Sequence, residues 1–316
     1  MPRTPEALSL NSSFDPETGL PVAVAPGIVR VTAPNAGPFT FTGTNSFVVG
    51  EERVLVIDPG PDDTRHLDAL LAAIDGRSVD AIVLTHTHRD HSGLARRLKA
   101  KTGAPIWSGG PHRLYRPTGW LERRLLARHC DFSLLPERTL EDGETIGIDG
   151  IGLTVLATPG HTANHLAFAV AGTPYLFTGD HVMGWSSTLV APPDGAMAPY
   201  LAALDKVIVA PFTHYLPAHG GTIPEGRKFA RALLAHRQER NAEIQRKVAG
   251  GATSAAQLVS RMYRGLKPGL RRAALWTVEA HLDYLVERGA LRRRRTLLGN
   301  RYTVANGAEA TDQSES

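Results

Sequence analysis

The sequence predicts an α/β fold with a second, small domain at its C-terminal end. Short apolar runs typical of buried strands alternate with segments whose leucines recur at helical spacing. A chain of 316 residues can hold one sizeable domain and an appendage, because domains usually contain about 100–200 residues. The sequence Ala249-Gly250-Gly251 interrupts a long helical pattern. We therefore expect one domain over residues 1–249 and another over 250–305, followed by a disordered tail at 306–316.

The first half of the chain alternates strand and helix patterns after a proline-rich start at residues 1–26, which we expect to be irregular. Runs of β-branched and aromatic residues joined by short turns predict strands, and leucines at helical spacing predict helices. We expect strands at residues 28–32, 40–50, 52–60 and 79–85, and helices at 63–76 and 92–103.

The second half of the first domain begins with more strand patterns. Residues 145–158 and 165–180 each contain two apolar runs separated by a glycine-containing turn, which predicts two further strand pairs. Helical patterns at about 200–209 and 224–248 then close this domain.

Composition excludes several classes of protein. The chain is 42% hydrophobic and 21% charged, as in ordinary globular domains. A membrane span needs about 18 consecutive apolar residues, and the sequence has no such stretch. The N-terminal segment lacks the apolar core of a secretory signal, so we expect a cytoplasmic location without membrane contact. Because Cys130 is the single cysteine, it excludes disulfides and cysteine-rich zinc fingers, which leaves histidines and carboxylates as metal ligands.

The most informative segment is HTHRDH at residues 86–91, at the point where an apolar strand gives way to a helix. Successive side chains of an extended backbone alternate sides, so His86 and His88 can share one cation. Asp90 and His91 lie on the turn into the helix, where they reach a neighbouring position. Histidine and carboxylate ligands suit Zn²⁺ or a similar divalent ion. The alternative interpretation is a polar turn with a capping aspartate and incidental histidines.

Three further ligand candidates each follow a predicted strand, in the sequences TPGHTANH, FTGDH and YLPAHGG. These candidates are His161, Asp180 and His219. A carboxylate such as that of Asp180 can bridge two cations about 3.5–4 Å apart. Each residue alone is more readily explained by burial or capping, and it is their joint occurrence after the hexad that indicates a metal site.

These motifs resemble those of the metallo-β-lactamase-fold hydrolases over most of the chain. The resemblance implies an αββα metallo-β-lactamase sandwich with two metal ions at one edge. It assigns His86, His88 and His161 to the first ion, Asp90, His91 and His219 to the second, and Asp180 to the bridge.

Asp58, in the sequence VIDPG, matches the family position that orients a metal-bound histidine. A simple turn at Asp-Pro-Gly is the alternative interpretation of that position.

Within this family the chain resembles a branch that includes a lactamase-like endoribonuclease and fungal thioesterases acting on acyl carrier protein. The segment 179–204 carries this likeness. True β-lactamases lack the bridging aspartate that Asp180 supplies. That branch has a C-terminal winged helix, and residues 253–265, 271–289 and 290–304 fit its two helices and its β-wing.

The C-terminal segment is basic. Residues 250–305 contain eleven Lys or Arg against three Asp or Glu, a surplus of eight in a chain whose net charge is +4. Arg292, Arg293, Arg294 and Arg295 on the wing offer contacts to nucleic-acid phosphates. As the alternative, the winged helix serves as a packing element, because its second helix carries an apolar stripe at helical spacing. That stripe consists of Leu275, Val278, Leu282 and Leu285.

Other residues give weaker signals. Trp185, Ser186 and Ser187 follow Asp180 closely, and we expect them to line a substrate pocket, with core packing as the alternative for the tryptophan. His112, His129, His165 and Cys130 belong to none of these motifs, and we assign them structural roles.

We therefore predict a hydrolase that uses two divalent ions, zinc in the first instance, and a metal-bridging hydroxide. Asp90 is the candidate for steering or accepting the proton of that water. The expected substrate is a thioester or related carbonyl compound, as a small molecule or on an acyl carrier. The alternatives are a single-strand-directed endoribonuclease and, less favoured because every ligand position is filled, a non-catalytic binding module. The sequence leaves the oligomeric state open.

Overall fold

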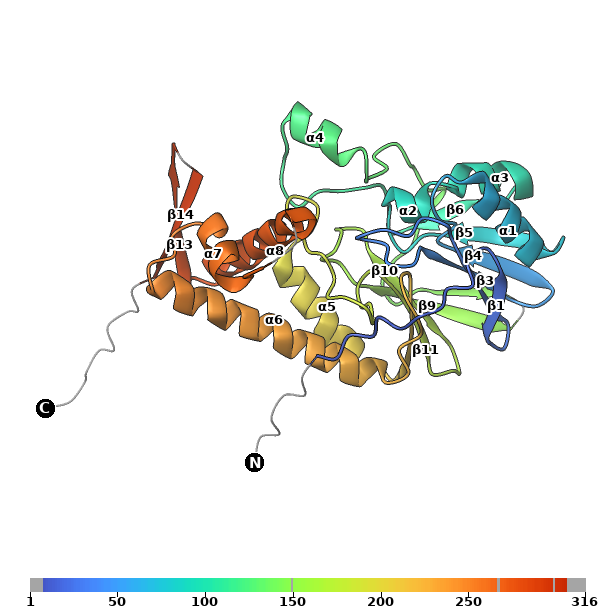
Figure 1. Cartoon of the computed structure of the whole chain (residues 1–316). Coiled ribbons are helices and arrows are strands. Elements are labelled where there is room, and N and C mark those ends of the chain that lie inside the picture. The colour runs from blue at the N-terminus through green and yellow to red at the C-terminus, as the bar shows by residue number, and fades with distance from the viewer. Residues whose placement is uncertain (1–7, 149, 266–267, 298, 306–316) are drawn as a thin grey trace, which may run out of the picture. The chain divides into compact units, whose positions relative to one another are not determined.

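The computed structural model describes residues 8–148, 150–265, 268–297 and 299–305. The chain divides into two compact units between Leu234 and Ala235. Figure 1 follows the chain from the N-terminus to the C-terminus by colour. The predicted disordered tail at residues 306–316 lies outside the described residues.

The first unit contains a seven-stranded sheet whose strands follow one another in chain order. Strands β1 to β4 are antiparallel neighbours, and β4 to β7 are parallel because helices or long loops connect them. The strands are β1 (Pro21–Ala25), β2 (Ile28–Thr32), β3 (Asn45–Val49), β4 (Arg53–Ile57), β5 (Ser78–Val83), β6 (Ile106–Ser108) and β7 (Arg138–Thr139).

A five-stranded sheet lies against the first one, in the order β12-β11-β10-β9-β8. Its strands pair antiparallel except for β11 and β12, which are parallel neighbours. The strands are β8 (Thr145–Ile148), β9 (Ile151–Ala157), β10 (Leu166–Val170), β11 (Tyr175–Gly179) and β12 (His214–Pro217).

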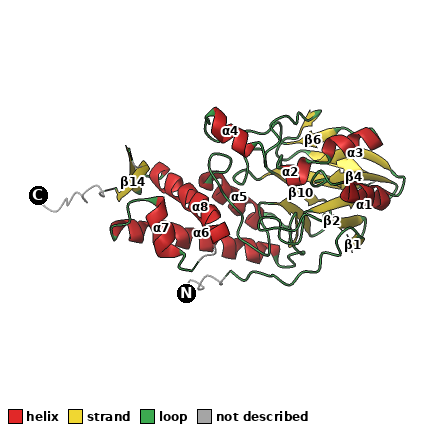
Figure 2. Ribbon diagram, turned by 45° about the horizontal axis from the view of Figure 1, so that its top comes forward, coloured by secondary structure: helices red, strands yellow, loops and turns green. Residues whose placement is uncertain are grey.

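Alternating side chains of the first sheet face two separate apolar cores. In β4, Leu55 and Ile57 face the second sheet, whereas Val54 and Val56 face α1 and α3. Both faces of this strand are buried, which explains its nearly continuous apolar sequence. Figure 2 shows α1 and α3 in red beside the yellow strands.

Helices complete the outer layers of the first unit. On the far side of the second sheet, Tyr215 of β12 donates its hydroxyl to the Val207 carbonyl of α5 at 2.9 Å. The two sheets with helices outside them form the predicted αββα sandwich. The helices of this part are α1 (Thr64–Ile74), α2 (Arg89–Ser92), α3 (Ala95–Thr102), α4 (Trp120–Leu126), α5 (Met197–Val209) and the beginning of α6 (Gly226–Ala249).

The second unit contains the end of α6, followed by α7 (Ala255–Met262), α8 (Pro268–Glu287) and a hairpin of β13 (Leu291–Thr296) and β14 (Gly299–Val304). Val278, Leu282 and Leu285 of α8 are buried in its core, as their spacing predicts. This succession of helix, helix and β-hairpin is the expected winged helix.

Two sequence expectations differ from the structure in detail. Residues 21–25 form β1 on the edge of the first sheet, although we expected residues 1–26 to be irregular. Pro21 begins this edge strand, where a missing N–H costs no ladder hydrogen bond, so proline does not exclude a strand here. Ile244 and Val248 of α6 pack into the winged-helix core. The boundary between the two units therefore lies inside α6, before the boundary at 249/250 that we expected.

Among the described residues, none of the helices combines the length and the apolar character that crossing a membrane requires.

Candidate metal centre

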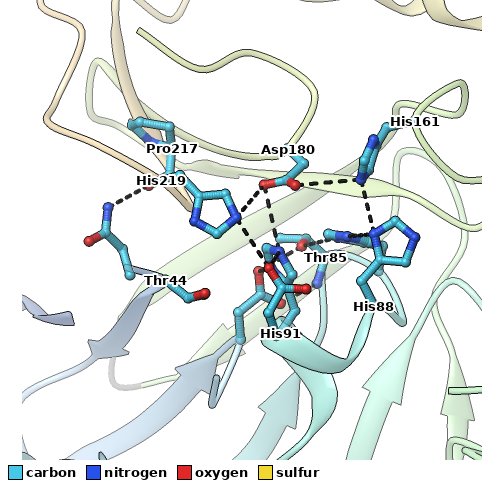
Figure 3. Close-up of polar contacts among 12 residues, drawn as sticks. Thr44, Thr85, His88, His91, His161, Asp180, Pro217 and His219 are labelled. Atoms are coloured by element: carbon cyan, nitrogen blue, oxygen red, sulfur yellow. Dashed lines mark hydrogen bonds and ion pairs between the residues drawn. The ribbon is translucent and has the colours of Figure 1, made fainter. Parts of the chain in front are cut away.

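The predicted ligands come from four connections in the first unit. His86 and His88 lie in the loop that follows β5, and Asp90 and His91 lie in α2 directly after it. His161 lies between β9 and β10, Asp180 directly follows β11, and His219 lies two residues beyond the end of β12. The two sheets thus deliver these side chains to one edge of the sandwich, where they face one another (Figure 3).

Three histidines form the first group. The Nδ1 atom of His88 lies 2.9 Å from Nε2 of His86 and 3.1 Å from Nε2 of His161. One ligand atom from each lies within 4.8 Å of the others, a geometry that could hold a metal ion. His86 is fully buried and His161 is 8% exposed, so this group is largely shielded from water.

Asp90, His91 and His219 form a second group of the same kind. The Asp90 Oδ2 atom lies 3.4 Å from Nε2 of both His91 and His219. Asp180 lies between the two groups, with one oxygen 3.4 Å from Nε2 of His161 and the other 3.3 Å from Nε2 of His219. Figure 3 shows this carboxylate between the two rings.

Asp58 fixes two of the histidine rings. Its Oδ2 atom accepts a proton from Nδ1 of His91 at 2.9 Å and from the Thr85 hydroxyl at 2.6 Å. Because the Thr85 hydroxyl gives its proton to Asp58, its oxygen accepts the Nδ1 proton of His86 at 3.0 Å. His86 and His91 are thereby left with unprotonated Nε2 atoms that face the site. Asp58 thus accepts a hydrogen bond from a ring that the resemblance assigns to the metal, and its orienting role stays a prediction.

Backbone carbonyls fix two more rings. Nδ1 of His161 donates to the Leu189 carbonyl at 2.7 Å, and Nδ1 of His219 donates to the Gly43 carbonyl at 3.2 Å. Carbonyl oxygens only accept, so each ring carries its proton on Nδ1 and presents Nε2 to the site.

His88 is oriented in the opposite sense. Its Nε2 atom lies 2.6 Å from a carboxylate oxygen of Asp194 and must carry the proton, which leaves Nδ1 to face His86 and His161. Three unprotonated nitrogens would then meet at about hydrogen-bond distance with no proton between them. A cation resolves this arrangement, because each nitrogen can donate its lone pair to the metal.

Orphaned atoms in the second group point to the same conclusion. Nε2 of His91, Nε2 of His219 and Oδ1 of Asp180 are buried and lack a hydrogen-bond partner among the described residues. Burying such atoms unpaired costs free energy, typically about 1–3 kcal/mol each. The donor set of nitrogens and carboxylate oxygens fits a first-row divalent ion.

The pKa values show how protons compete with a cation for these atoms. Burial opposes protonation of His219, but the carboxylates of Asp180 and Asp90 together outweigh it and raise the pKa of His219 to about 9. Burial alone would raise the pKa of Asp180, yet His219 and His91 hold it well below its usual value, so this carboxylate is ionised. Metal binding therefore displaces protons from the histidines.

Gly179 makes the approach of Asp180 possible. Its φ is +50°, and a Cβ atom there would lie 2.6 Å from Nε2 of His165 and 2.8 Å from Cβ of Thr85. The same His165 nitrogen accepts the Asp180 backbone N–H at 3.1 Å. His165 thus has the structural role that we expected, and it holds the backbone of the central carboxylate.

The expected pocket residues follow Asp180 on the same loop. Trp185 stacks on Phe41 with ring centroids 4.9 Å apart, and a Cβ atom on Gly220, which adjoins His219, would lie 3.2 Å from Cδ1 of its ring. The Trp185 indole nitrogen is buried without a hydrogen-bond partner among the described residues. The Ser186 hydroxyl donates to the Ser187 carbonyl at 3.3 Å. A substrate role for all three residues stays a prediction.

Sequence reasoning missed a second polar cluster beside the first histidine group. Asp194, His112 and Cys130 surround the far side of the His88 ring. We assigned His112 and Cys130 structural roles and did not single out Asp194 at all. The sequence Pro-Pro-Asp-Gly around Asp194 is typical of a turn, and only the fold brings it to His88, which lies 106 residues earlier.

The wing arginines lie in the second unit, on β13. All four are exposed, but strand alternation separates Arg292 and Arg294 from Arg293 and Arg295. Arg293 pairs with Asp283 of α8 at 2.6 Å, so its face of the hairpin is the one turned toward the helix. The four arginines therefore do not form a single patch.

Comparison with known families agrees with this geometry. Residues 39–219 match the metallo-beta-lactamase superfamily, and residues 254–296 match the beta-lactamase associated winged helix domain. The chain therefore belongs to the metallo-beta-lactamase superfamily and is a hydrolase of that superfamily with a C-terminal winged helix.

Individual relatives share most of the chain. A beta-lactamase-like protein 2 homolog of Caenorhabditis elegans is 27% identical over 69% of each chain. An atrochrysone carboxyl ACP thioesterase of Cryptosporiopsis sp. is 27% identical over 80% of this chain and 77% of the relative. Among solved structures, a beta-lactamase domain protein from Burkholderia ambifaria has a TM-score of 0.76 at 25% identity, over 93% of this chain and 96% of the other.

Proposed function

We propose that the chain is a dinuclear, zinc-dependent hydrolase of thioesters or related carbonyl compounds. One observation carries the metal part: five histidine rings have their outward nitrogens committed to acceptors, so that their free nitrogens point into two neighbouring groups of ligand atoms that include the carboxylates of Asp90 and Asp180. The proposed ligands are His86, His88 and His161 for one ion, Asp90, His91 and His219 for the other, and Asp180 between them.

When bound, such ions supply hydroxide at neutral pH and polarise the scissile carbonyl. The chain's own residues set the geometry of that reaction. The Asp180 side chain is 9% exposed and contacts both ligand groups, so it fixes the distance between them. The Asp90 side chain is 30% exposed, so solvent and substrate reach it, and its carboxylate is our candidate for receiving the proton of the attacking water.

A carbonyl substrate is supported by the surroundings and by the relatives. The stacked rings of Phe41 and Trp185 present an aromatic surface next to the segment that carries His219, and apolar walls with few polar groups are usual for small-molecule pockets. An acyl carrier protein thioesterase is among the relatives. An acyl group, free or on a carrier, is therefore the substrate class that we propose.

Parallel assays of the zinc-loaded chain test this proposal. We expect turnover of a panel of acyl thioesters, with loss of turnover in Asp180→Asn and no cleavage of unstructured RNA. RNA cleavage that depends on Asp180, without thioester turnover, would replace the proposal by an endoribonuclease. Turnover that persists in Asp180→Asn would show that another site is responsible.

The endoribonuclease is the second candidate, and one observation favours it. Arg292 and Arg294 share the outer face of the hairpin, and Arg301 lies directly opposite Arg294 in the register. Three cations on one face can contact successive phosphates of a single strand. Thioester hydrolysis remains the preferred proposal, because it accounts for the stacked aromatic rings.

A further inference from the structure

Asp194 lies in the loop between β11 and α5, and hydrogen bonds fix the backbone of that loop. The N–H groups of Asp194 and Gly195 both donate to the Ala191 carbonyl, at 3.1 and 2.8 Å. From the other side, Tyr115 donates its N–H to the Pro193 carbonyl at 2.9 Å. The position of the Asp194 carboxylate is thus set by two separate segments of the chain.

The carboxylate is buried at 7% exposure and has polar neighbours on both oxygens. Oδ2 accepts the Nε2 proton of His88 at 2.6 Å and lies 3.6 Å from Sγ of Cys130. Oδ1 lies 3.0 Å from Nε2 of His112. A buried carboxylate needs such partners, because an unpaired one costs several kcal/mol.

His112 is held in turn by the hexad loop itself. Its Nδ1 atom lies 2.8 Å from the hydroxyl of Thr87, which lies between His86 and His88 in the sequence. The Asn164 side chain donates to the same hydroxyl at 2.8 Å and to the Gly110 carbonyl at 3.0 Å. The network therefore begins and ends on the loop that carries His88.

We infer that Asp194 is the positioning residue for His88, and that it fixes this ring with Nδ1 directed at His86 and His161. A carboxylate that accepts the far N–H of a histidine both orients the ring and makes its free nitrogen a stronger donor. His112 and Cys130 act through Asp194, because they hold its carboxylate in place. This inference rests on the proposed metal site.

The two ligand groups then have matched support. Asp58 accepts the far N–H of His91 in the second group, and Asp194 accepts that of His88 in the first. The other three histidines donate to neutral oxygens, the Thr85 hydroxyl and two backbone carbonyls. Each group thus contains one histidine backed by a charge, and we expect that histidine to contribute most to the affinity of its group.

The test compares zinc affinity of Asp194→Asn with that of the unmodified chain, by competition with a chelator. We expect one of two ions to bind about 10–100-fold more weakly, since removal of such a carboxylate has effects of that size, and the other to keep its affinity. In the cobalt-loaded protein, the visible absorption of one ion should change. Asp194→Glu retains the charge and should recover part of the lost affinity.

Asp131→Asn is the matched control. This carboxylate is 1% exposed and binds Arg96, Arg89 and Ser133, and among the described residues it contacts no proposed ligand. The inference is overturned if Asp194→Asn binds both ions normally, or if Asp131→Asn loses one ion to the same extent. It is also overturned if the unmodified chain holds a third ion that Asp194→Asn loses, because Asp194 would then be a ligand.

A second measurement needs no substitution at Asp194. In the zinc-loaded chain labelled with ¹⁵N-histidine, nuclear magnetic resonance should show His88 with its proton on Nε2. A proton on Nδ1 overturns the inference even if two ions bind. A chain that binds no zinc overturns both this inference and the proposed metal site, whereas two bound ions with an unchanged Asp194→Asn overturn only the role of Asp194.

Discussion

The histidine cluster of the first unit and the arginine hairpin of the second use charge in different ways. Four of the five histidines are buried and His88 is half-buried, and each one has its outward nitrogen bound to a fixed acceptor, as the pair of His91 and Asp58 illustrates. The wing arginines are exposed, and Arg293 is paired with Asp283 on α8. Oriented charges act strongly where water is excluded, whereas exposed ones are screened by salt. We therefore expect hydrolysis to depend on the first region far more than on the second.

The largest effect should come from Asp180, which contacts both ligand groups. Asp180→Asn removes the central charge, and we expect hydrolysis to fall by about three orders of magnitude, equivalent to about 4 kcal/mol of the several that metal-assisted charge stabilisation supplies. Elemental analysis should find fewer than two ions per chain. Full metal content and near-normal turnover in this variant would remove Asp180 from the site.

His66 gives a contrast with the cluster, because its buried ring hydrogen-bonds to a serine hydroxyl and not to a carboxylate. Burial lowers its pKa from 6.5 to about 4, and its Nε2 atom pairs with the Ser46 hydroxyl at 2.8 Å. The unfolded chain binds a proton below pH 6.5 while the folded chain stays neutral. The stability that neutral His66 contributes is therefore fully present above pH 6.5, and the free energy of unfolding falls by about 3 kcal/mol as the pH drops toward 4.

Denaturant unfolding of the chain and of His66→Gln, at several pH values between 7 and 4, measures this effect. The difference between the two free energies of unfolding should shrink by that amount as the pH falls, because glutamine does not titrate and the other groups cancel. Parallel curves over the whole range would show that His66 is not kept neutral by the fold.

Trp185 tests whether the region next to the metal centre binds substrate. Trp185→Phe keeps an aromatic ring against Phe41 but removes the indole N–H, for which the described part of the chain offers no hydrogen-bond partner. If that N–H binds substrate, KM for an acyl thioester should rise up to about tenfold, which corresponds to one hydrogen bond. The kcat should change little, because that hydrogen bond would be equally strong in the bound substrate and in the transition state. An unchanged KM would assign the residue to packing.

The smallest effect should come from the outer face of the hairpin. Replacing Arg292, Arg294 and Arg301 by Gln should lower RNA affinity modestly and leave the hydrolysis of a small neutral ester nearly unchanged. If three phosphate contacts are lost, the slope of log affinity against log salt concentration should become less steep by about 2. Affinity measured at two ionic strengths distinguishes these cases, and a slope that stays constant would exclude this face from nucleic-acid binding.

Much of the candidate site could be predicted because its residues are signalled locally. The hexad packs four ligand-type side chains into one turn, and His161, Asp180 and His219 each follow a recognisable strand. Asp194 lacks such a signal, since a turn sequence explains it equally well and its partner is 106 residues away. Local spacing encodes neighbours along one element, whereas contacts between distant loops depend on the whole fold.

The wing shows the same limit at a smaller scale. Four consecutive arginines suggest one basic patch in the sequence, but residues on a strand point alternately to opposite faces. The register opposes Arg293 to Tyr302, which is 3% exposed, and Arg294 to Arg301. The sequence predicts the hairpin, while the structure shows which half of the run faces outward.

Gly179 limits how this hydrolase can be altered. Any side chain there would meet His165 and Thr85, and these residues hold Asp180 and Asp58 in position. In a library that samples every amino acid along β11, position 179 should accept glycine alone. When variants are selected for activity on new substrates, we therefore expect substitutions in the loop beyond Asp180 and none at the end of the strand.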